Sequence, residues 1–135
     1  MVSALKKSAV PTLRALGFRG SFPHFYRDRD GQLDLITFQF SRNGGQFVAE
    51  LSFATPDRSN LPKPFRALPP SQLRSFHSMR RKRLGGSGHG DHWFVYASSN
   101  DSSRLAASPE EIAACCAELL RTEGESWWRS VRADS

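Results

Sequence analysis

The sequence predicts an α+β fold in which an antiparallel sheet of four or five strands has N-terminal and C-terminal helices packed on one face. Apolar residues recur at steps of three and four near both ends of the chain, and at steps of two between Phe22 and Phe53. The chain has 135 residues, of which 39% are hydrophobic and 24% are charged. This length and this balance fit one core, so we expect a single domain over residues 1–135.

The N-terminal helix follows from a stripe of apolar residues at helical spacing, namely Val2, Leu5, Ala9, Leu13 and Leu16. Pro11 lies inside this stripe, lacks a backbone N–H and clashes with the preceding turn. We therefore expect either a kink near Lys7 or a helix that begins at Ser8. Gly17 suits the left-handed conformation just beyond a helix end, so we expect the helix to end there.

The middle of the chain predicts three consecutive antiparallel strands. The first strand covers His24–Arg27, and the turn residues Asp28-Arg29-Asp30-Gly31 lead into a second strand over Leu33–Phe40. Arg42-Asn43-Gly44-Gly45 is typical of a second hairpin turn, and Phe47–Phe53 then alternates regularly between an inward and an opposite face.

The second of these strands has apolar residues on both faces. Leu33 and Leu35 fall on one face, whereas Ile36 and Phe38 fall on the other, so the strand is either buried on both sides or bulged. Gln39 is the polar exception. If its side chain is buried, it needs hydrogen-bond partners, and the two interpretations are a structural role that bridges backbone groups and a ligand-binding role.

The second half of the chain begins with less regular structure. Five prolines make Ala54–Pro70 an irregular surface connection, Ser71–Leu84 fits either a short helix or a strand, and His92–Ala97 is typical of a strand.

The C-terminal helix is marked by Ser108 as its N-cap, Pro109 in its first turn and Glu111 closing a capping box. We expect Gly124 to end it. A last short helix over Glu125–Arg132 is then expected to press Trp127 or Trp128 onto the sheet.

The positive charge is concentrated in one stretch of sequence. Between Arg58 and Gly90 there are eight basic side chains and no acidic one, whereas the rest of the chain has 11 basic and 13 acidic residues. Together with Phe65, Phe76 and Trp93, which could stack on bases, this stretch is a candidate nucleic-acid surface. The alternative is a solvated basic loop or strand balanced by carboxylates elsewhere in the fold.

Two features of the basic run Arg80-Arg81-Lys82-Arg83 bear on phosphate binding. A glycine-rich segment follows the run, and backbone amides together with guanidinium groups complement phosphate. In an extended strand, however, Arg81 and Arg83 share one face while Arg80 and Lys82 share the other, so one ligand could meet only half of the charges.

The composition also bears on location. No apolar run approaches the roughly 20 residues that a membrane-spanning helix needs, and no apolar stretch typical of a signal peptide follows Met1–Lys7. Cys115 and Cys116 are sequence neighbours, which rarely form a disulfide with each other. We therefore expect a cytoplasmic protein without a membrane partner.

The residues that most resemble metal ligands are His77, His89, Asp91 and His92. Structural zinc sites usually place cysteines on ordered elements, and no cysteine accompanies this group, so we predict no metal. No activated nucleophile and no pair of catalytic carboxylates stands out. The sequence therefore predicts no catalytic residue and no cofactor, and an enzyme is disfavoured.

Several short motifs occur in a recognisable order: Leu16-Gly17-Phe18-Arg19, Phe25-Tyr26-Arg27, Ile36-Thr37-Phe38-Gln39-Phe40-Ser41, His77, Arg83-Leu84-Gly85 and Asp91-His92-Trp93-Phe94. Their order resembles the bacterial family called domain of unknown function 4304. The resemblance runs from about Leu13 to Phe94, and the C-terminal helix is compatible with it. It implies a compact α+β domain and, as the family's name says, no established activity, substrate or cofactor.

The leading functional hypothesis is a non-catalytic module that binds another macromolecule, with a protein-partner or immunity-type role. The first alternative is phosphate or nucleic-acid binding through residues 74–83, and the second is an unrecognised enzyme or metal-binding protein. The sequence leaves the oligomeric state open. The predicted ligand-binding or partner-binding residues are Gln39, Arg74, His77, Arg80, Arg81, Lys82, Arg83 and Trp93.

Overall fold

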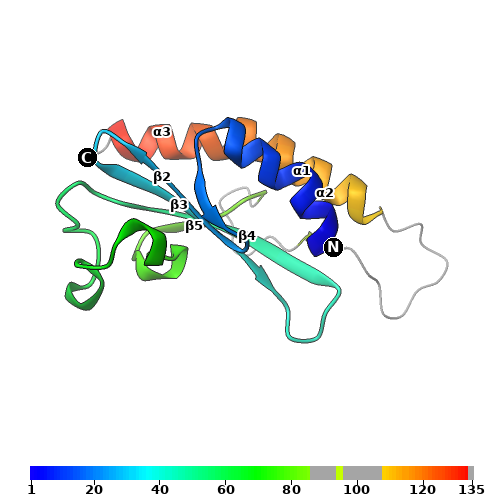
Figure 1. Cartoon of the computed structure of the whole chain (residues 1–135), viewed down its shortest axis with the longest axis horizontal. Coiled ribbons are helices and arrows are strands. Elements are labelled where there is room, and N and C mark those ends of the chain that lie inside the picture. Colours follow the sequence, from blue (N-terminus) through cyan, green and yellow to red (C-terminus); the bar gives the residue numbers. More distant parts are fainter. Residues whose placement is uncertain (86–93, 96–107, 134–135) are drawn as a thin grey trace.

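Three helices cover one face of an antiparallel sheet, as Figure 1 shows. The computed structural model describes residues 1–85, 94–95 and 108–133. Its helices are α1 (Val2–Ala15), α2 (Pro109–Leu119) and α3 (Glu125–Ala133). The predicted α+β class, with N-terminal and C-terminal helices on one face of the sheet, is confirmed. None of the described helices combines the length and apolar character that a membrane span requires.

The described part of the sheet has six strands, all paired antiparallel. Five of them follow chain order across the sheet, and the sixth pairs with the end of β4. The strands are β1 (Arg19–Ser21), β2 (His24–Arg29), β3 (Gln32–Phe40), β4 (Gln46–Ala54), β5 (Arg81–Arg83) and β6 (Phe94–Val95). Strand β1 was not predicted, because three exposed residues show no apolar alternation.

Helix α1 begins at Val2, so the predicted start at Ser8 is wrong. Pro11 lies on the exposed side of the helix, where water can reach the carbonyl that loses its N–H partner. The predicted end is confirmed, because Gly17 has φ +97° and directly follows the capping residue Leu16.

Strand β3 is buried on both faces, which confirms the first of its two predicted alternatives. Ile36 and Phe38 belong to the main core beneath the helices. Leu33 and Leu35 pack on the other side in a second cluster, together with Ala54, Leu61, Leu73, Tyr26 and Leu68. The connection after β4 therefore supplies a second covering layer, which Figure 1 shows in green on the side of the sheet away from the helices.

That connection contains three short 3-10 turns, at Lys63–Phe65, Pro70–Gln72 and Ser75–His77. The ambiguous segment Ser71–Leu84 thus holds 3-10 structure first and strand β5 afterwards. Of the strand expected over His92–Ala97, Phe94 and Val95 form β6, and the other positions lie outside the described residues.

The prediction that Gly124 ends the C-terminal helix is wrong. Ser108 caps α2 by accepting a hydrogen bond from the Glu111 N–H at 3.1 Å, and a π-helical turn over Leu120–Gly124 then leads directly into α3. A Cβ at Gly124 would lie 3.4 Å from the Trp128 ring, so the glycine allows close packing there. Trp128 is buried, and its indole N–H donates to the Ser52 carbonyl at 3.0 Å.

The outer edge of the sheet at β1 is held by a side chain from α1. The Arg14 guanidinium donates to the carbonyl of Gly20 at 2.6 Å and to that of Phe18 at 3.3 Å. It also lies over the Phe25 ring, 5.3 Å from its centroid. The end of α1 and the first strand are thereby fixed to each other.

A buried ion pair lies where the helices meet the sheet. Arg27 is 3% exposed and Asp34 is fully buried, and two nitrogens of Arg27 donate to Asp34 Oδ2 at 2.9 and 2.7 Å. Glu125 forms a salt bridge with Arg27 Nη2 at 2.7 Å. Burial raises the pKa of Asp34 despite the guanidinium beside it, whereas hydrogen bonds and charges from Arg27 and Arg29 outweigh burial and lower the pKa of Glu125.

Phe38 and Phe47 provide a test of the strand registers. Their rings are 6.3 Å apart in the main core, and both side chains are buried. Replacing either by alanine should lower the free energy of unfolding by about 3 to 5 kcal/mol, because it removes apolar contacts and leaves a cavity. Urea unfolding measures the change. An unchanged midpoint in a cooperatively folding variant would show that these registers are wrong.

Candidate functional site

A row of polar side chains crosses the face of the sheet opposite the helices. His24 on β2 pairs with Thr37 on β3, Thr37 pairs with Glu50 on β4, and Glu50 pairs with Arg83 on β5. Cross-strand partners of this kind point to the same face, so four consecutive strands each contribute one polar group. We call these four residues the polar row.

The 3-10 turn η3 (Ser75–His77) lies on this row and is anchored to it. The Ser75 N–H donates to Thr37 Oγ1 at 3.2 Å, and the Ser75 hydroxyl donates to Glu50 Oε1 at 2.9 Å. Ser75 and Ser78 are both buried, and the amide of Asn60 donates to the Ser78 hydroxyl at 3.4 Å. Both ends of the segment 75–78 are therefore tied to the protein.

Between and beside these anchors, two large apolar side chains face solvent. Phe76 is 54% exposed and Met79 is 76% exposed, the highest values among the large hydrophobic residues that the structure describes. A fixed backbone thus presents an aromatic ring and a thioether at the surface. Contiguous apolar patches mark interaction surfaces, and this segment is the candidate for part of one among the described residues.

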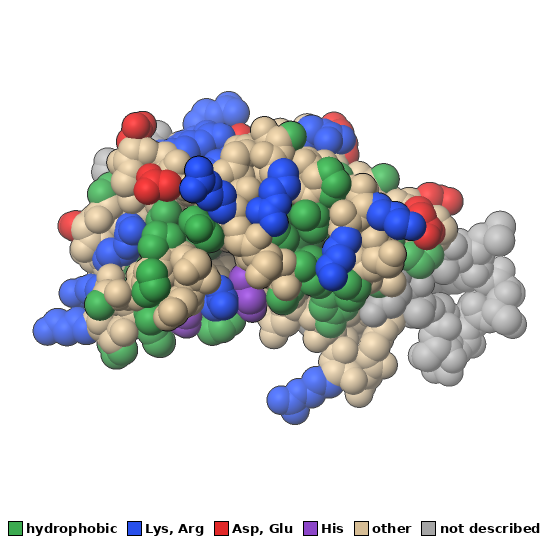
Figure 2. Space-filling model, viewed as in Figure 1, with side chains coloured by type: hydrophobic (Ala, Val, Ile, Leu, Met, Phe, Trp, Pro, Cys, Tyr) green, Lys and Arg blue, Asp and Glu red, His purple; other side chains and the backbone are tan. Residues whose placement is uncertain are grey.

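Aromatic and imidazole rings support the exposed phenylalanine. His77 stacks on Phe65 with ring centroids 4.3 Å apart, and Phe76 meets His77 in an edge-to-face arrangement with ring centroids 4.8 Å apart. His24 lies 6.5 Å from Phe76 in an edge-on arrangement. Figure 2 shows histidine side chains on one face of the molecule with a basic side chain beside them.

Both described histidines are neutral near pH 7. Burial lowers the pKa of His24 to about 4, with help from the positive charge of Arg74 and from His77. Burial and the Arg74 charge also lower the pKa of His77. Each ring uses its Nδ1 within the fold: His24 shares a 3.0 Å hydrogen bond with Thr37 Oγ1, and His77 accepts one from the Arg74 N–H at 3.0 Å.

The basic run divides between two faces, as its alternation predicts. Arg81 and Arg83 each lie 3.6 Å from a carboxylate oxygen of Glu50, whereas Lys82 forms a 3.2 Å salt bridge with Glu123. The Arg80 guanidinium lies 6.0 Å from the centroid of the Phe53 ring. Carboxylates thus offset much of the charge that the sequence concentrates here.

The structure brings several of the predicted binding residues together. Arg74, His77, Arg81 and Arg83 lie around the polar row and η3, whereas Lys82 pairs with a glutamate of the helical layer. Gln39 is exposed, so the structural role that depended on its burial does not apply.

Other predicted residues lie elsewhere. Trp93 lies outside the described residues, as do His89, Asp91 and His92, three of the four residues that most resemble metal ligands. Within the described part, no group of three or more His, Cys, Asp or Glu side chains could hold a metal ion.

Sequence reasoning missed His24, Thr37, Glu50, Ser75 and Met79. The turn between β2 and β3 would have revealed the first pair, because Arg29 and Gln32 flank a two-residue turn and fix the register that places His24 opposite Thr37.

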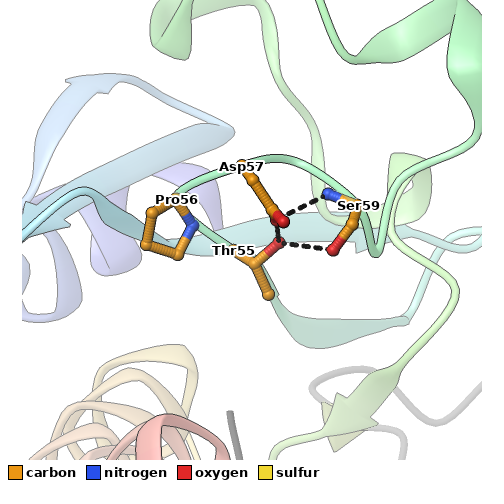
Figure 3. A pocket seen from close by; sticks show the side chains of 4 residues that line it. All are labelled: Thr55, Pro56, Asp57 and Ser59. Carbon is orange, nitrogen blue, oxygen red and sulfur yellow. Dashed lines mark hydrogen bonds between the residues drawn. The ribbon is translucent and has the colours of Figure 1, made fainter.

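A separate hollow lies after β4, lined by Thr55, Pro56, Asp57 and Ser59 (Figure 3). Its polar groups bond to each other: Asp57 Oδ1 accepts from the Thr55 hydroxyl at 2.8 Å and from the Ser59 N–H at 3.0 Å. These hydrogen bonds lower the pKa of Asp57 to about 2. The arrangement stabilises the turn and leaves little polar capacity for a ligand.

Comparison with known proteins gives one match. A family model described as "Domain of unknown function (DUF4304)" matches residues 9–128. No curated protein and no solved structure matches the chain. The match covers the sheet, the polar row and most of the helical layer, but its description carries no activity.

The lowered pKa of His24 makes stability depend on pH. The pKa falls from 6.5 to about 4 on folding, so protonation favours the unfolded state, and the stabilisation present above pH 6.5 is lost as the pH falls toward 4. After allowance for solvent screening of this partly exposed ring, we expect about 1 kcal/mol less stability at pH 5 than at pH 7 from His24 alone. Urea unfolding should show a smaller difference between these pH values for His24→Gln. Equal differences in variant and wild type would contradict the assignment.

Proposed function

Since the chain belongs to the DUF4304 family, we propose a function from its own surface: a non-catalytic module that binds another protein, as a partner-binding or immunity-type protein does. The observation that carries this proposal is the exposure of Phe76 and Met79 on an anchored segment. Aromatic and methionine side chains are enriched in protein interfaces. Because the segment is already ordered, binding would cost little conformational entropy.

The charges around these two side chains indicate the character of the partner. Arg74 is half-buried, Arg80 is exposed, and the chain has a formal net charge of +6. Complementary charge speeds association and excludes wrong partners. We therefore expect an acidic protein surface that can receive an apolar side chain. The two free cysteines are consistent with a reducing compartment, so we place this binding in the cytoplasm.

The binding proposal is tested by Phe76→Ala combined with Met79→Ala. The double variant should lower affinity for a partner captured from the source cell at least tenfold, because both apolar anchors are lost, while the fold is kept. Val2→Ala is the matched control, since Val2 is an exposed apolar residue on α1. Capture is measured after nuclease treatment, by titration of the purified partner. Equal affinities for the double variant and the control would refute the proposal.

Phosphate or nucleic-acid binding through residues 74–83 is the second candidate, and the density of basic residues favours it. Three contacts count against it, because Arg81 and Arg83 lie beside Glu50 and Lys82 pairs with Glu123. A polyanion would have to compete with these carboxylates. The protein-partner proposal therefore predicts only weak binding to oligonucleotides.

Salt dependence separates the two candidates. We expect binding to single-stranded and double-stranded oligonucleotides to disappear by about 0.15 M salt, with little preference between them. Fluorescence anisotropy at two salt concentrations measures this. Submicromolar affinity at about 0.15 M salt, lost when residues 80–83 are neutralised, would replace the protein-partner proposal by nucleic-acid binding.

A further inference from the structure

We propose that His24, Arg74 and His77 form a carboxylate-binding site beside Phe76, and that it receives an aspartate or glutamate side chain of the protein partner. This inference rests on the proposed function and specifies the chemistry of the same surface. Nothing in the match to the family assigns such a site.

Hydrogen bonds hold both rings in place and fix where the proton of His77 lies. His77 Nδ1 accepts from the backbone N–H of Arg74, so the neutral ring carries its proton on Nε2. Thr37 Oγ1 accepts from the Ser75 N–H and lies 3.0 Å from His24 Nδ1, so the His24 ring is held in place by its Nδ1.

Nε2 of each ring is the atom left for a ligand. No described residue forms a hydrogen bond with Nε2 of either ring, because the hydrogen bonds of His24 and His77 within the described residues all use Nδ1. Both rings are half-buried and held by neighbours, so their Nε2 atoms are fixed in direction. The fixed N–H donor of His77 complements a carboxylate oxygen.

Arg74 supplies the positive charge. Its guanidinium makes one hydrogen bond within the described residues, from Nη1 to the Ser71 carbonyl at 2.8 Å, so the charge has no carboxylate partner there. The backbone N–H of Arg74 donates to His77 Nδ1 at 3.0 Å, so Arg74 and that ring belong to the same turn. The neighbouring acid Glu50 is already engaged by Ser75, Arg81 and Arg83. A hydrogen bond between a guanidinium and a carboxylate is about twice as strong as one between neutral groups.

The adjacent aromatic ring explains why the acid would belong to a protein. Phe76 contacts both imidazoles and is exposed, so a partner that places a carboxylate on the rings also places its neighbouring atoms on Phe76. An acidic side chain next to an apolar one fits both parts of the surface. The site thus determines how the partner is oriented on the exposed segment.

The test uses the full-length protein and small carboxylates as probes. Glutarate and acetate are titrated while the ring ¹⁵N and ¹³C resonances of the histidines are followed by NMR. We expect saturable shifts at His24 and His77 together, and at least tenfold weaker binding in Arg74→Gln. Arg66→Gln is the matched control, because Arg66 lies in the same connection and bonds only the Leu61 and Ser59 carbonyls.

Three outcomes would overturn the site: no shift at either ring in the wild type, equal binding by Arg74→Gln and Arg66→Gln, or saturation by inorganic phosphate at lower concentration than by glutarate. The wild-type titration does not depend on the folding of any variant. If the glutarate titration fails but partner capture still depends on Phe76, the carboxylate site is refuted and the protein-binding function stands. Glutarate binding without a Phe76 effect on capture refutes the protein-binding function and leaves a site for free carboxylates.

Discussion

Arg27 carries a charge that is almost wholly removed from water, so its guanidinium must find every partner inside the protein. Those partners come from four places: Asp34 on β3, the Leu16 carbonyl at the end of α1, Glu125 at the start of α3, and the faces of Phe18 and Trp128. Removing one partner of a buried pair typically costs about 3 to 5 kcal/mol, because the other charge is left uncompensated. The position of the helices on the sheet depends on this contact.

With its helical face fixed in this way, the sheet can use its other face differently. Strands β3 and β4 are buried on both sides, and the proline-rich connection covers the apolar half of that second face through Leu61 and Leu73. The polar row occupies the remainder. Within this row, the Thr37 hydroxyl and the Glu50 carboxylate accept hydrogen bonds from Ser75. These contacts hold the segment that presents Phe76. A structural polar network and a candidate interaction surface thus share the same few atoms.

The sequence predicts the elements better than their partners, and the reason is physical. Burial of one face leaves a local period, so α1, the middle strands and the C-terminal helices could be located from apolar spacing. The predictions from Pro11 and Gly124 were wrong because the effect of each residue depends on its surroundings. Pro11 lies on the side of its helix that faces water, and Gly124 packs against the Trp128 ring, and neither can be read from neighbouring residues in the sequence. The tight turns before His24 and before Gln32 fix their registers within a few residues.

The same distinction applies to the candidate site. Arg74 and His77 could be chosen by residue type, but Glu50 comes from a strand whose pairing follows a longer loop, and Ser75 reaches it from 25 residues away. Met79 gave no sequence indication, since exposure of a lone methionine depends on how its loop is anchored. Such contacts depend on the tertiary structure, which the spacing of residues along a short stretch of sequence does not reveal.

The hydrogen bonds of Arg14 have a further consequence for assembly. Strand β1 ends the sheet, and an unprotected sheet edge can recruit a strand from another chain and so begin fibrous aggregation. The Arg14 guanidinium occupies the Gly20 carbonyl at this edge, and the charge would have to be displaced before a foreign strand could pair there. A single side chain from α1 therefore protects the protein against growth of its own sheet along this side.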